Sequence, residues 1–263
     1  MNDVFEEVIK SRKYSNIDRS IVMRICEEAL HKYPKKKEAI KAAKNQLHII
    51  HESFLMADCY KVAYSILDDE KDSIILNGLN KDTSIRIMGL HASTKERIAN
   101  IEETYSWLSE YIDIESTLID VGCGFNPFAI PFIINRPKRY YAYDISNESA
   151  ELLNYFFSMA KLTDYKAMIL DATVNTPSES ADVLLAFKLL PLLQQQKKGR
   201  AFSFLEEALF HKAIISFPIK SLSGKEKGML DFYTRFFEEG LPQGIDIIER
   251  KVINNELFYV ISK

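Results

Sequence analysis

Apolar residues recur every three or four positions in the first part of the chain. This spacing predicts amphipathic helices over residues 20–33, 35–56 and 58–67, with Pro34 between the first two. The polar stretch 68–72 and Asn77-Gly78 predict loops. Because nothing before Ser116 has the pattern of a strand, residues 1–110 are expected to form an all-helical N-terminal domain.

The pattern changes after Ser116, where short apolar, β-branched or aromatic runs alternate with helical segments. Such alternation predicts α/β architecture with a mostly parallel sheet covered on both faces. Two runs that flank Asn254-Asn255 predict an antiparallel hairpin at the C-terminus. The layout of residues 111–263 resembles the Rossmann-like class I methyltransferase domain, whereas NAD-binding domains generally lack such a hairpin. The predicted strands cover residues 117–121, 140–143, 167–170, 183–187, 213–217, 245–253 and 256–261.

A glycine-containing turn follows the first predicted strand, in Asp120-Val-Gly-Cys-Gly124. The glycines stand where the chain turns tightly toward a helix expected to begin near Pro127, and where the backbone can approach a ligand. A dinucleotide site would normally carry a third glycine, but Asn126-Pro127 occupies that stretch. S-adenosylmethionine has no pyrophosphate that requires it. The loop therefore predicts an S-adenosylmethionine site that includes Asp120, Gly122 and Gly124.

Two further acidic residues follow the next two predicted strands. Asp144 comes about twenty residues after the glycines, where a carboxylate can accept hydrogen bonds from both ribose hydroxyls. Asp171 follows the third strand and is placed to contact the adenine amine. Either residue can instead be a helix N-cap or a loop carboxylate. Because ligands bind at the carboxyl edge of an open α/β sheet, acids at three successive strand ends favour the cofactor site.

The composition is that of an ordinary globular protein, with 47% hydrophobic and 27% charged residues. No apolar run approaches the ~18 residues needed to cross a bilayer, and the first ten residues lack the pattern of a secretory signal. Cys26, Cys59 and Cys123 are far apart and odd in number, which predicts free thiols, no zinc site and no other metal. These features predict a cytoplasmic protein.

The net charge of −3 hides a local asymmetry. Residues 1–50 hold 11 Lys or Arg against 7 Asp or Glu, whereas residues 51–115 hold 6 against 13. Residues 188–227 again have an excess of Lys and Arg. Basic stretches of this kind can bind nucleic-acid phosphates or can be no more than solvated helix faces, and charge alone leaves both interpretations open.

The segment Leu90-His-Ala-Ser-Thr-Lys-Glu-Arg97 resembles one found just before the cofactor domain in the aminoglycoside-resistance 16S rRNA (guanine-N7) methyltransferases of the Arm/Rmt type. Further matches are Val121-Gly-Cys-Gly-Phe-Asn-Pro127, Lys188-Leu-Leu-Pro191 with Gln194-Gln-Gln196, and residues 216–224 with Gly228-Met229. The resemblance extends from about residue 86 to the C-terminus. Lys95, Phe125 and Phe128 stand where other members often differ.

The resemblance implies that Arg97 reaches the methionyl carboxylate of S-adenosylmethionine, a contact suited to a bidentate guanidinium. Gly122, Gly124, Asp144 and Asp171 would hold the remainder of the cofactor. His91, Ser93 and Gln195 are further implied contacts. Since Ser93-Thr-Lys-Glu96 also has the pattern of a capping box, the same segment is expected to start a helix.

The resemblance also implies that Lys188, Lys220, Lys225 and Met229 lie near the target base. Lysines there can neutralise phosphates and Met229 can pack against a base, although the same residues can form a solvated loop. The expected RNA contacts outside this group are Lys35, Lys36, Lys37, Lys41, Lys197, Lys198 and Arg200.

The function implied is methylation of guanine N7 in the decoding-site helix of 16S rRNA, by a monomer acting on the small ribosomal subunit and giving aminoglycoside resistance. Guanine N7 carries a lone pair and no proton, so its methylation needs no general base. An exocyclic amine target would favour an Asp/Asn-Pro-Pro-Tyr segment, and a cytosine C5 target a late cysteine; the sequence has neither. The alternative is a methyltransferase of the same fold that acts on another RNA site, a small molecule or a protein, with the N-terminal helices as a lid.

Overall fold

The computed structural model describes residues 2–11, 13–220 and 228–263, and within these ranges the strands form one seven-stranded sheet. The order is β3-β2-β1-β4-β5-β7-β6, in which β7 alone runs in the direction opposite to the other six strands. This confirms the predicted Rossmann-like class I methyltransferase fold with its C-terminal hairpin. The strands are β1 (Thr117–Val121), β2 (Arg139–Asp144), β3 (Tyr165–Ile169), β4 (Ala181–Phe187), β5 (Phe210–Pro218), β6 (Asp246–Ile253) and β7 (Glu256–Ser262).

Helices cover both faces of this sheet because successive side chains of a buried strand point to opposite sides. In β1, Leu118 belongs to the hydrophobic cluster on one face and Ile119 to the cluster on the other. The first face packs against α4 (Cys59–Asp69), α5 (Lys71–Asn77), α6 (Lys81–Met88), α8 (Ile101–Leu108), η3 (Asn126–Phe132) and α9 (Asn147–Met159). The second face packs against α10 (Leu189–Gln196), α11 (Arg200–Glu207) and α12 (Met229–Gly240).

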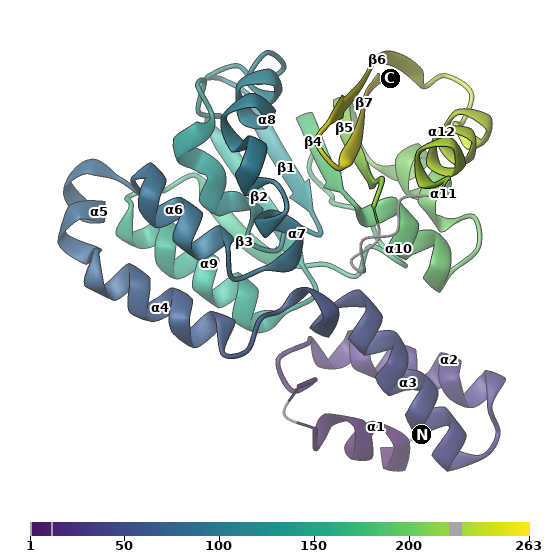
Figure 1. The fold of residues 1–263 in the computed structure, drawn as a ribbon. Helices are drawn as coiled ribbons and strands as arrows, with labels where there is room; N and C mark the ends of the chain where they lie inside the picture. Colours follow the sequence, from purple (N-terminus) through teal and green to yellow (C-terminus); the bar gives the residue numbers. More distant parts are fainter. Residues whose placement is uncertain (1, 12, 221–227) are drawn as a thin grey trace.

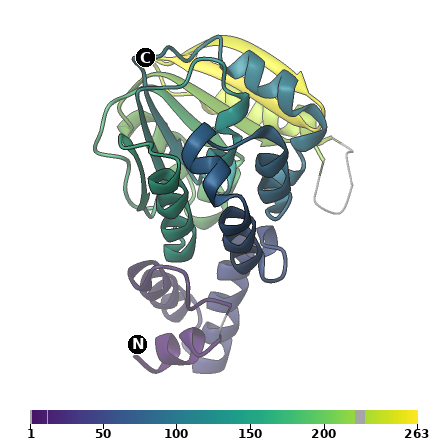
Figure 2. The same cartoon turned by 90° about the vertical axis from the view of Figure 1, so that its left-hand side faces the viewer.

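The first helices form a separate layer at one end of the molecule, which Figures 1 and 2 both show below the sheet. We call α1 (Asn2–Ile9), α2 (Arg19–Lys32) and α3 (Lys36–Ile50) the helical unit. Its apolar side chains, from Val4 to Leu47, form their own hydrophobic cluster. The residues from Cys59 to Ile112 instead share a cluster with the sheet. A boundary at residue 110 would cut that core, and we propose that the domain division falls near residues 51–58.

Several local predictions need correction. The turn after Gly124 leads into the 3-10 helix η3 rather than an α-helix, and Pro131 lies inside it, where a missing amide hydrogen weakens α-helical bonding. The predicted helix 35–56 ends at Ile50 and is followed by η1 (Glu52–Phe54), and α4 and α5 take up most of the predicted loop 68–72. His91, not Ser93, is the N-cap of the one-turn helix α7 (Ala92–Lys95), so the predicted capping box does not form. The 3-10 turn η2 (Ile98–Asn100) follows it.

Among the described residues, no helix combines the length and the apolar character that crossing a membrane requires. Cys26, Cys59 and Cys123 are buried free thiols, as expected from their spacing.

Candidate cofactor and substrate site

A cleft of about 860 Å³, counting its open mouth, lies at the carboxyl edge of the parallel strands. It is bounded by the glycine loop after β1, the ends of β2, β3 and β4, and residues of the helical unit and η1. Gly122, Gly124, Asp144 and Asp171, all predicted from the sequence, line it together with His91, Ser93 and Lys188. The structure therefore brings most of the predicted cofactor residues to one place.

The glycine loop has no room for side chains. Gly122 and Gly124 have φ angles of +68° and +49°, which favour glycine. A Cβ atom on Gly124 would stand 2.9 Å from two ring atoms of His91, and one on Gly122 would stand 3.1 Å from a methyl carbon of Leu189. The backbone can thus approach a ligand here more closely than any other residue would permit.

Asp144 is oriented by backbone amides from both sides. Its Oδ2 accepts a hydrogen bond from the Gly124 amide at 2.9 Å, and its Oδ1 accepts from the amides of Ile145 at 2.7 Å and Ser146 at 3.1 Å. A carboxylate has about four lone-pair positions, so these three bonds fix its direction and leave capacity toward the cleft. This is an arrangement that suits recognition of a pair of ribose hydroxyls.

His91 lies over the glycine loop and is aimed at the cleft. Its ring stacks on Phe54 and packs against Phe125, with ring centroids 5.8 Å and 5.5 Å away. Its Nδ1 atom is buried and has no hydrogen-bond partner among the described residues. Burial first, and then positive charge at neighbouring side chains, lowers the pKa of His91 to about 3, so the ring is neutral at physiological pH. A neutral imidazole can offer this nitrogen to a bound polar ligand.

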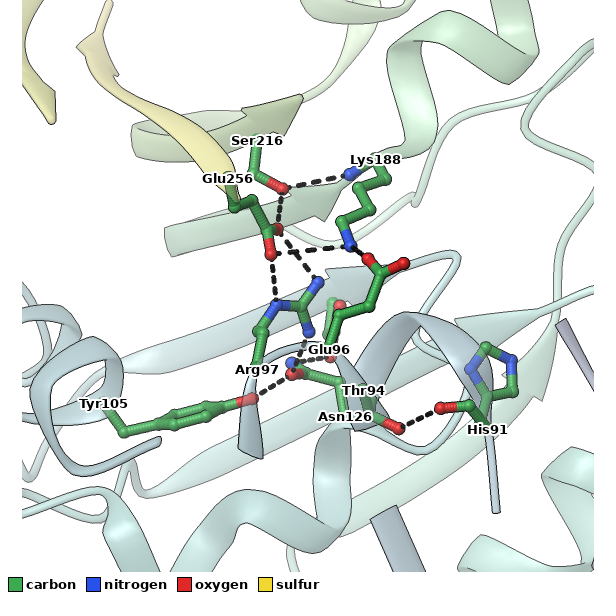
Figure 3. Close-up of polar contacts among 10 residues, drawn as sticks. His91, Thr94, Glu96, Arg97, Tyr105, Asn126, Lys188, Ser216 and Glu256 are labelled. Carbon is green, nitrogen blue, oxygen red and sulfur yellow. Dashed lines mark hydrogen bonds and ion pairs between the residues drawn. The ribbon is translucent and has the colours of Figure 1, made fainter. Parts of the chain in front are cut away.

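Three predicted cofactor residues, Arg97, Asp120 and Gln195, do not line the cleft, and the first two are buried beside it. Arg97 is 4% exposed, and its Nε and Nη2 atoms bind the Glu256 carboxylate at 2.9 Å and 3.1 Å (Figure 3). Its Nη1 donates to Asn126, so a protein carboxylate already occupies the guanidinium predicted to hold the methionyl carboxylate. Asp120 lies beneath the loop, where it accepts from Asn126 and from the Tyr140 hydroxyl at 2.8 Å. Both residues thus bind protein groups in this structure, and their direct contacts with the cofactor stay a prediction.

Lys188 joins the cleft to this buried charge cluster. It lines both the cleft and a smaller pocket beside Glu256, and its Nζ pairs with Glu96 and lies 3.7 Å from Glu256 (Figure 3). Its left-handed backbone, φ 55°, turns the chain from β4 into α10. Burial alone would raise the pKa of Glu256, but Arg97 and Lys188 keep it below its ordinary value. The lysine ammonium is thus held at the cleft by two carboxylates.

The remaining predictions differ in their outcome. Gln195 is exposed, and Gln196, one residue further along α10, lines the cleft instead, because only residues three or four apart share a helix face. Arg200 is 4% exposed and bound to the carbonyls of Ala172 and Asn175, so its guanidinium is not free for RNA, contrary to the prediction.

The predicted basic residues are mostly at the surface. Lys35, Lys36, Lys37 and Lys41 are exposed at the start of α3, as are Lys197 and Lys198 after α10. Lys220 follows β5 and Met229 begins α12, both partly exposed, whereas Lys225 lies outside the described residues. Arg24 of α2 binds Gln196 of α10 at 3.3 Å, and both residues line the cleft.

Sequence reasoning missed the contribution of the first helices to the cleft. Ile21 and Arg24 of α2, Phe54 of η1 and Tyr60 of α4 all line it. Their partners lie far away in the sequence, and Arg24 binds Asp171 across 147 positions. No local motif marks such a contact.

A seven-stranded sheet of this order with a glycine loop and acidic strand ends defines a class I methyltransferase. A family model described as ribosomal RNA methyltransferase (FmrO) matches residues 10–260, and the chain belongs to this family.

Relatives of this chain match it over nearly their whole length. A 16S rRNA (guanine(1405)-N(7))-methyltransferase of Serratia marcescens is 30% identical over 265 residues, covering 100% of this chain and 98% of the relative. One from Micromonospora echinospora is 30% identical over 275 residues, covering 100% and 97%. The crystal structure of the 16S rRNA methyltransferase RmtF with S-adenosyl-L-homocysteine matches with a TM-score of 0.89 at 28% identity, covering 100% and 97%. The 16S rRNA methylase RmtB matches with a TM-score of 0.81 at 27% identity, covering 100% and 98%.

Proposed function

We propose that this protein transfers the methyl group of S-adenosylmethionine to N7 of a guanine in 16S rRNA. The observation that carries the proposal is the cleft, which combines the two glycines of the loop with Asp144 and Asp171 in a chain that matches 16S rRNA (guanine(1405)-N(7))-methyltransferases from end to end. The nucleotide that the relatives' names specify is the expected target.

The residues in the cleft fit the cofactor. The loop carries no side chain at Gly122 or Gly124, Asp144 has acceptor capacity for ribose hydroxyls, and the buried Nδ1 of His91 has no hydrogen-bond partner in the described part of the chain. Lys188 and Ser93 are polar residues that line the cleft, and they would hold the methionyl carboxylate. When bound, S-adenosylmethionine supplies an electrophilic methyl group on a sulfonium.

The residues around the cleft would act by positioning. Because N7 of guanine has a free lone pair, the enzyme has only to align the base and needs no proton acceptor. The neutral His91 agrees with such a site. In paired RNA the N7 edge lies in a deep, narrow groove, so the base must leave its stack to enter the cleft. Lys188, Lys220, Lys225 and Met229 are the proposed residues around it.

The two basic stretches support binding of folded RNA. Lys36, Lys37 and Lys41 are exposed on α3, whose last residue Ile50 lines the cleft, and Lys197 and Lys198 directly follow Gln196, which also lines it, so both stretches can contact phosphates of an RNA whose base enters the cleft. We propose that the substrate is the assembled small ribosomal subunit, that the protein acts on it as a monomer in the cytoplasm, and that the modification confers aminoglycoside resistance.

The test is methyl transfer from labelled S-adenosylmethionine to small subunits, large subunits, free 16S rRNA and a metabolite extract. We expect label in small subunits, and chain cleavage at one guanine after borohydride and aniline treatment. Label only in the metabolite extract would favour the small-molecule alternative. Label in rRNA without borohydride-dependent cleavage would exclude N7. Susceptible bacteria that express the protein should grow at raised aminoglycoside concentrations, and those that express D144A should not.

A further inference from the structure

Arg24 connects the helical unit to the carboxyl edge of the parallel strands, which we call the cofactor edge. Its Nε donates to Oδ2 of Asp171 at 2.6 Å and its Nη2 to Oδ1 at 3.3 Å, a two-pronged contact. The side chains of Arg24 and Asp171 are only 15% and 10% exposed. Among the residues that the structure describes, this is the sole ion pair between the helical unit and the remainder of the chain.

The other contacts of the helical unit fall on the same edge. Backbone bonds join Asp18 to Ile145, with an N to O distance of 3.0 Å, and Asn147 to Asn16 at 2.8 Å. Ile145 and Ile169 pack against the unit's hydrophobic cluster. Every one of these partners directly follows β2 or ends β3. The helical unit therefore docks on the segments that carry Asp144 and Asp171.

The contact leaves Asp171 able to bind a ligand. Arg24 and the amide of Thr173, at 3.0 Å, take three of the about four lone-pair positions of this carboxylate. The remaining position belongs to Oδ2, on a side chain that lines the cleft. Asp171, which Arg24 holds in a fixed orientation, can therefore accept a hydrogen bond from an adenine amine.

We infer that Arg24 is a positioning residue of the cofactor site, which holds Asp171 for the adenine and thereby couples docking of the helical unit to cofactor binding. The inference rests on the proposed function only in taking S-adenosylmethionine as the ligand. Since coupling between two equilibria is reciprocal, the cofactor tightens docking to the same extent that docking tightens the cofactor. Apolar residues of α3 and α2 pack in one hydrophobic cluster, so the lysines on the outer face of α3, which are proposed to bind RNA, should move together with Arg24.

The experiment combines calorimetric titration with S-adenosylhomocysteine and hydrogen exchange of the whole protein. The variants are R24A, R24K and D171N, with R19A as the matched control, because Arg19 is an arginine of the same helix that lies over Phe5 within the helical unit. In the wild type and R19A, the ligand should slow exchange of the Asp18 and Asn147 amides, which bridge the two parts. In R24A the Kd should rise about tenfold and this slowing should disappear.

R24K and a double-mutant cycle separate coupling from loss of folding. R24K keeps one charge but not the two-pronged geometry, so its Kd should lie between those of the wild type and R24A. In the D171N background, R24A should add little, because Arg24 acts through Asp171. Full additivity, a Kd for R24A within twofold of the wild type, or tighter binding would overturn the inference. Absence of binding to the wild type would instead overturn the proposed cofactor.

Discussion

At the scale of single residues, Gly124 sets the clearance between the loop and His91. Its φ of +49° and the 2.9 Å separation of a Cβ from the imidazole mean that G124A must move either the ring or the loop. We expect G124A to weaken S-adenosylhomocysteine binding by about tenfold or more and to cost about 1–3 kcal/mol of stability. The control is G244A, since Gly244 has φ +83° but nothing within 4 Å of an added Cβ. Equal losses of ligand affinity in both variants would contradict this account.

Protonation of His91 makes the stability of the folded protein depend on pH. The ordinary pKa of 6.5 applies in the unfolded chain, whereas the folded ring stays neutral to about pH 3, so the unfolded chain gains the proton first. Its contribution to stability should fall by about 2 kcal/mol between pH 7 and 5. Burial raises the pKa of Asp120 to about 6, so the folded protein takes up this proton before the unfolded chain does. The contribution of Asp120 to stability therefore rises as the pH falls from 7 to 5.

The melting temperature of H91Q measured across this range isolates the histidine, because Asp120 is common to both proteins. We expect the wild type to lose more of its melting temperature between pH 7 and 5 than H91Q does. Parallel curves would show that His91 is protonated in the folded protein.

Sequence reasoning identified the residues whose roles depend on their local backbone. Gly122, Gly124 and Asp144 were predictable because a turn after a buried strand restricts what can stand there. Arg97 is predicted to hold a ligand carboxylate, and in the structure its guanidinium binds the carboxylate of Glu256, 159 positions away. Charge type and spacing could not reveal this partner. Gln195 and Gln196 lie on different faces of the same helix, and a run of three glutamines does not show which of them faces the cleft.

At the scale of elements, the strands were more predictable than the helices around them. Every predicted strand occurs. Strands buried on both faces, such as β1 and β4, have a continuous apolar run that loops and helix surfaces lack, whereas β6 is mostly exposed and was predicted as one arm of the hairpin. The hairpin turn followed from Asn254-Asn255, and Asn254 adopts φ 50° there. The ends of the short helices between η1 and α8 are set by packing on the sheet, so hydrophobic periodicity does not predict them.

The element α3 carries the prediction about RNA. Lys37 and Lys41 are exposed, so reversing both charges in K37E/K41E should leave folding intact and weaken binding to small subunits. Each lost phosphate contact should reduce the slope of log affinity against log salt by about 0.7–0.9. Binding at a series of salt concentrations measures this. The control K138E changes an exposed lysine at the amino end of β2, on the opposite edge of the sheet, and an equal loss there would indicate a nonspecific charge effect.

At the scale of the whole molecule, the cofactor edge is where separately packed parts meet. Two hydrophobic clusters lie on the two faces of the sheet and the third lies within the helical unit, and Ile169 packs against both the first and the third. The sequence indicated a helical part and an α/β part, but it could not show that they meet over the cofactor cleft. That arrangement depends on contacts such as Arg24 with Asp171, which join residues 147 positions apart.

Because the cleft is lined by both parts, a ligand bound there should stabilise the molecule as one unit. S-adenosylhomocysteine at 100 times its Kd adds about 2.7 kcal/mol, which for a chain of this length raises the melting temperature by about 5 °C. Calorimetry should show one transition that moves upward in the wild type and scarcely moves in D144A. A ligand that shifts only part of a divided transition would show that the helical unit melts independently of the cleft, and that its contacts with the cofactor edge are too weak to join the two.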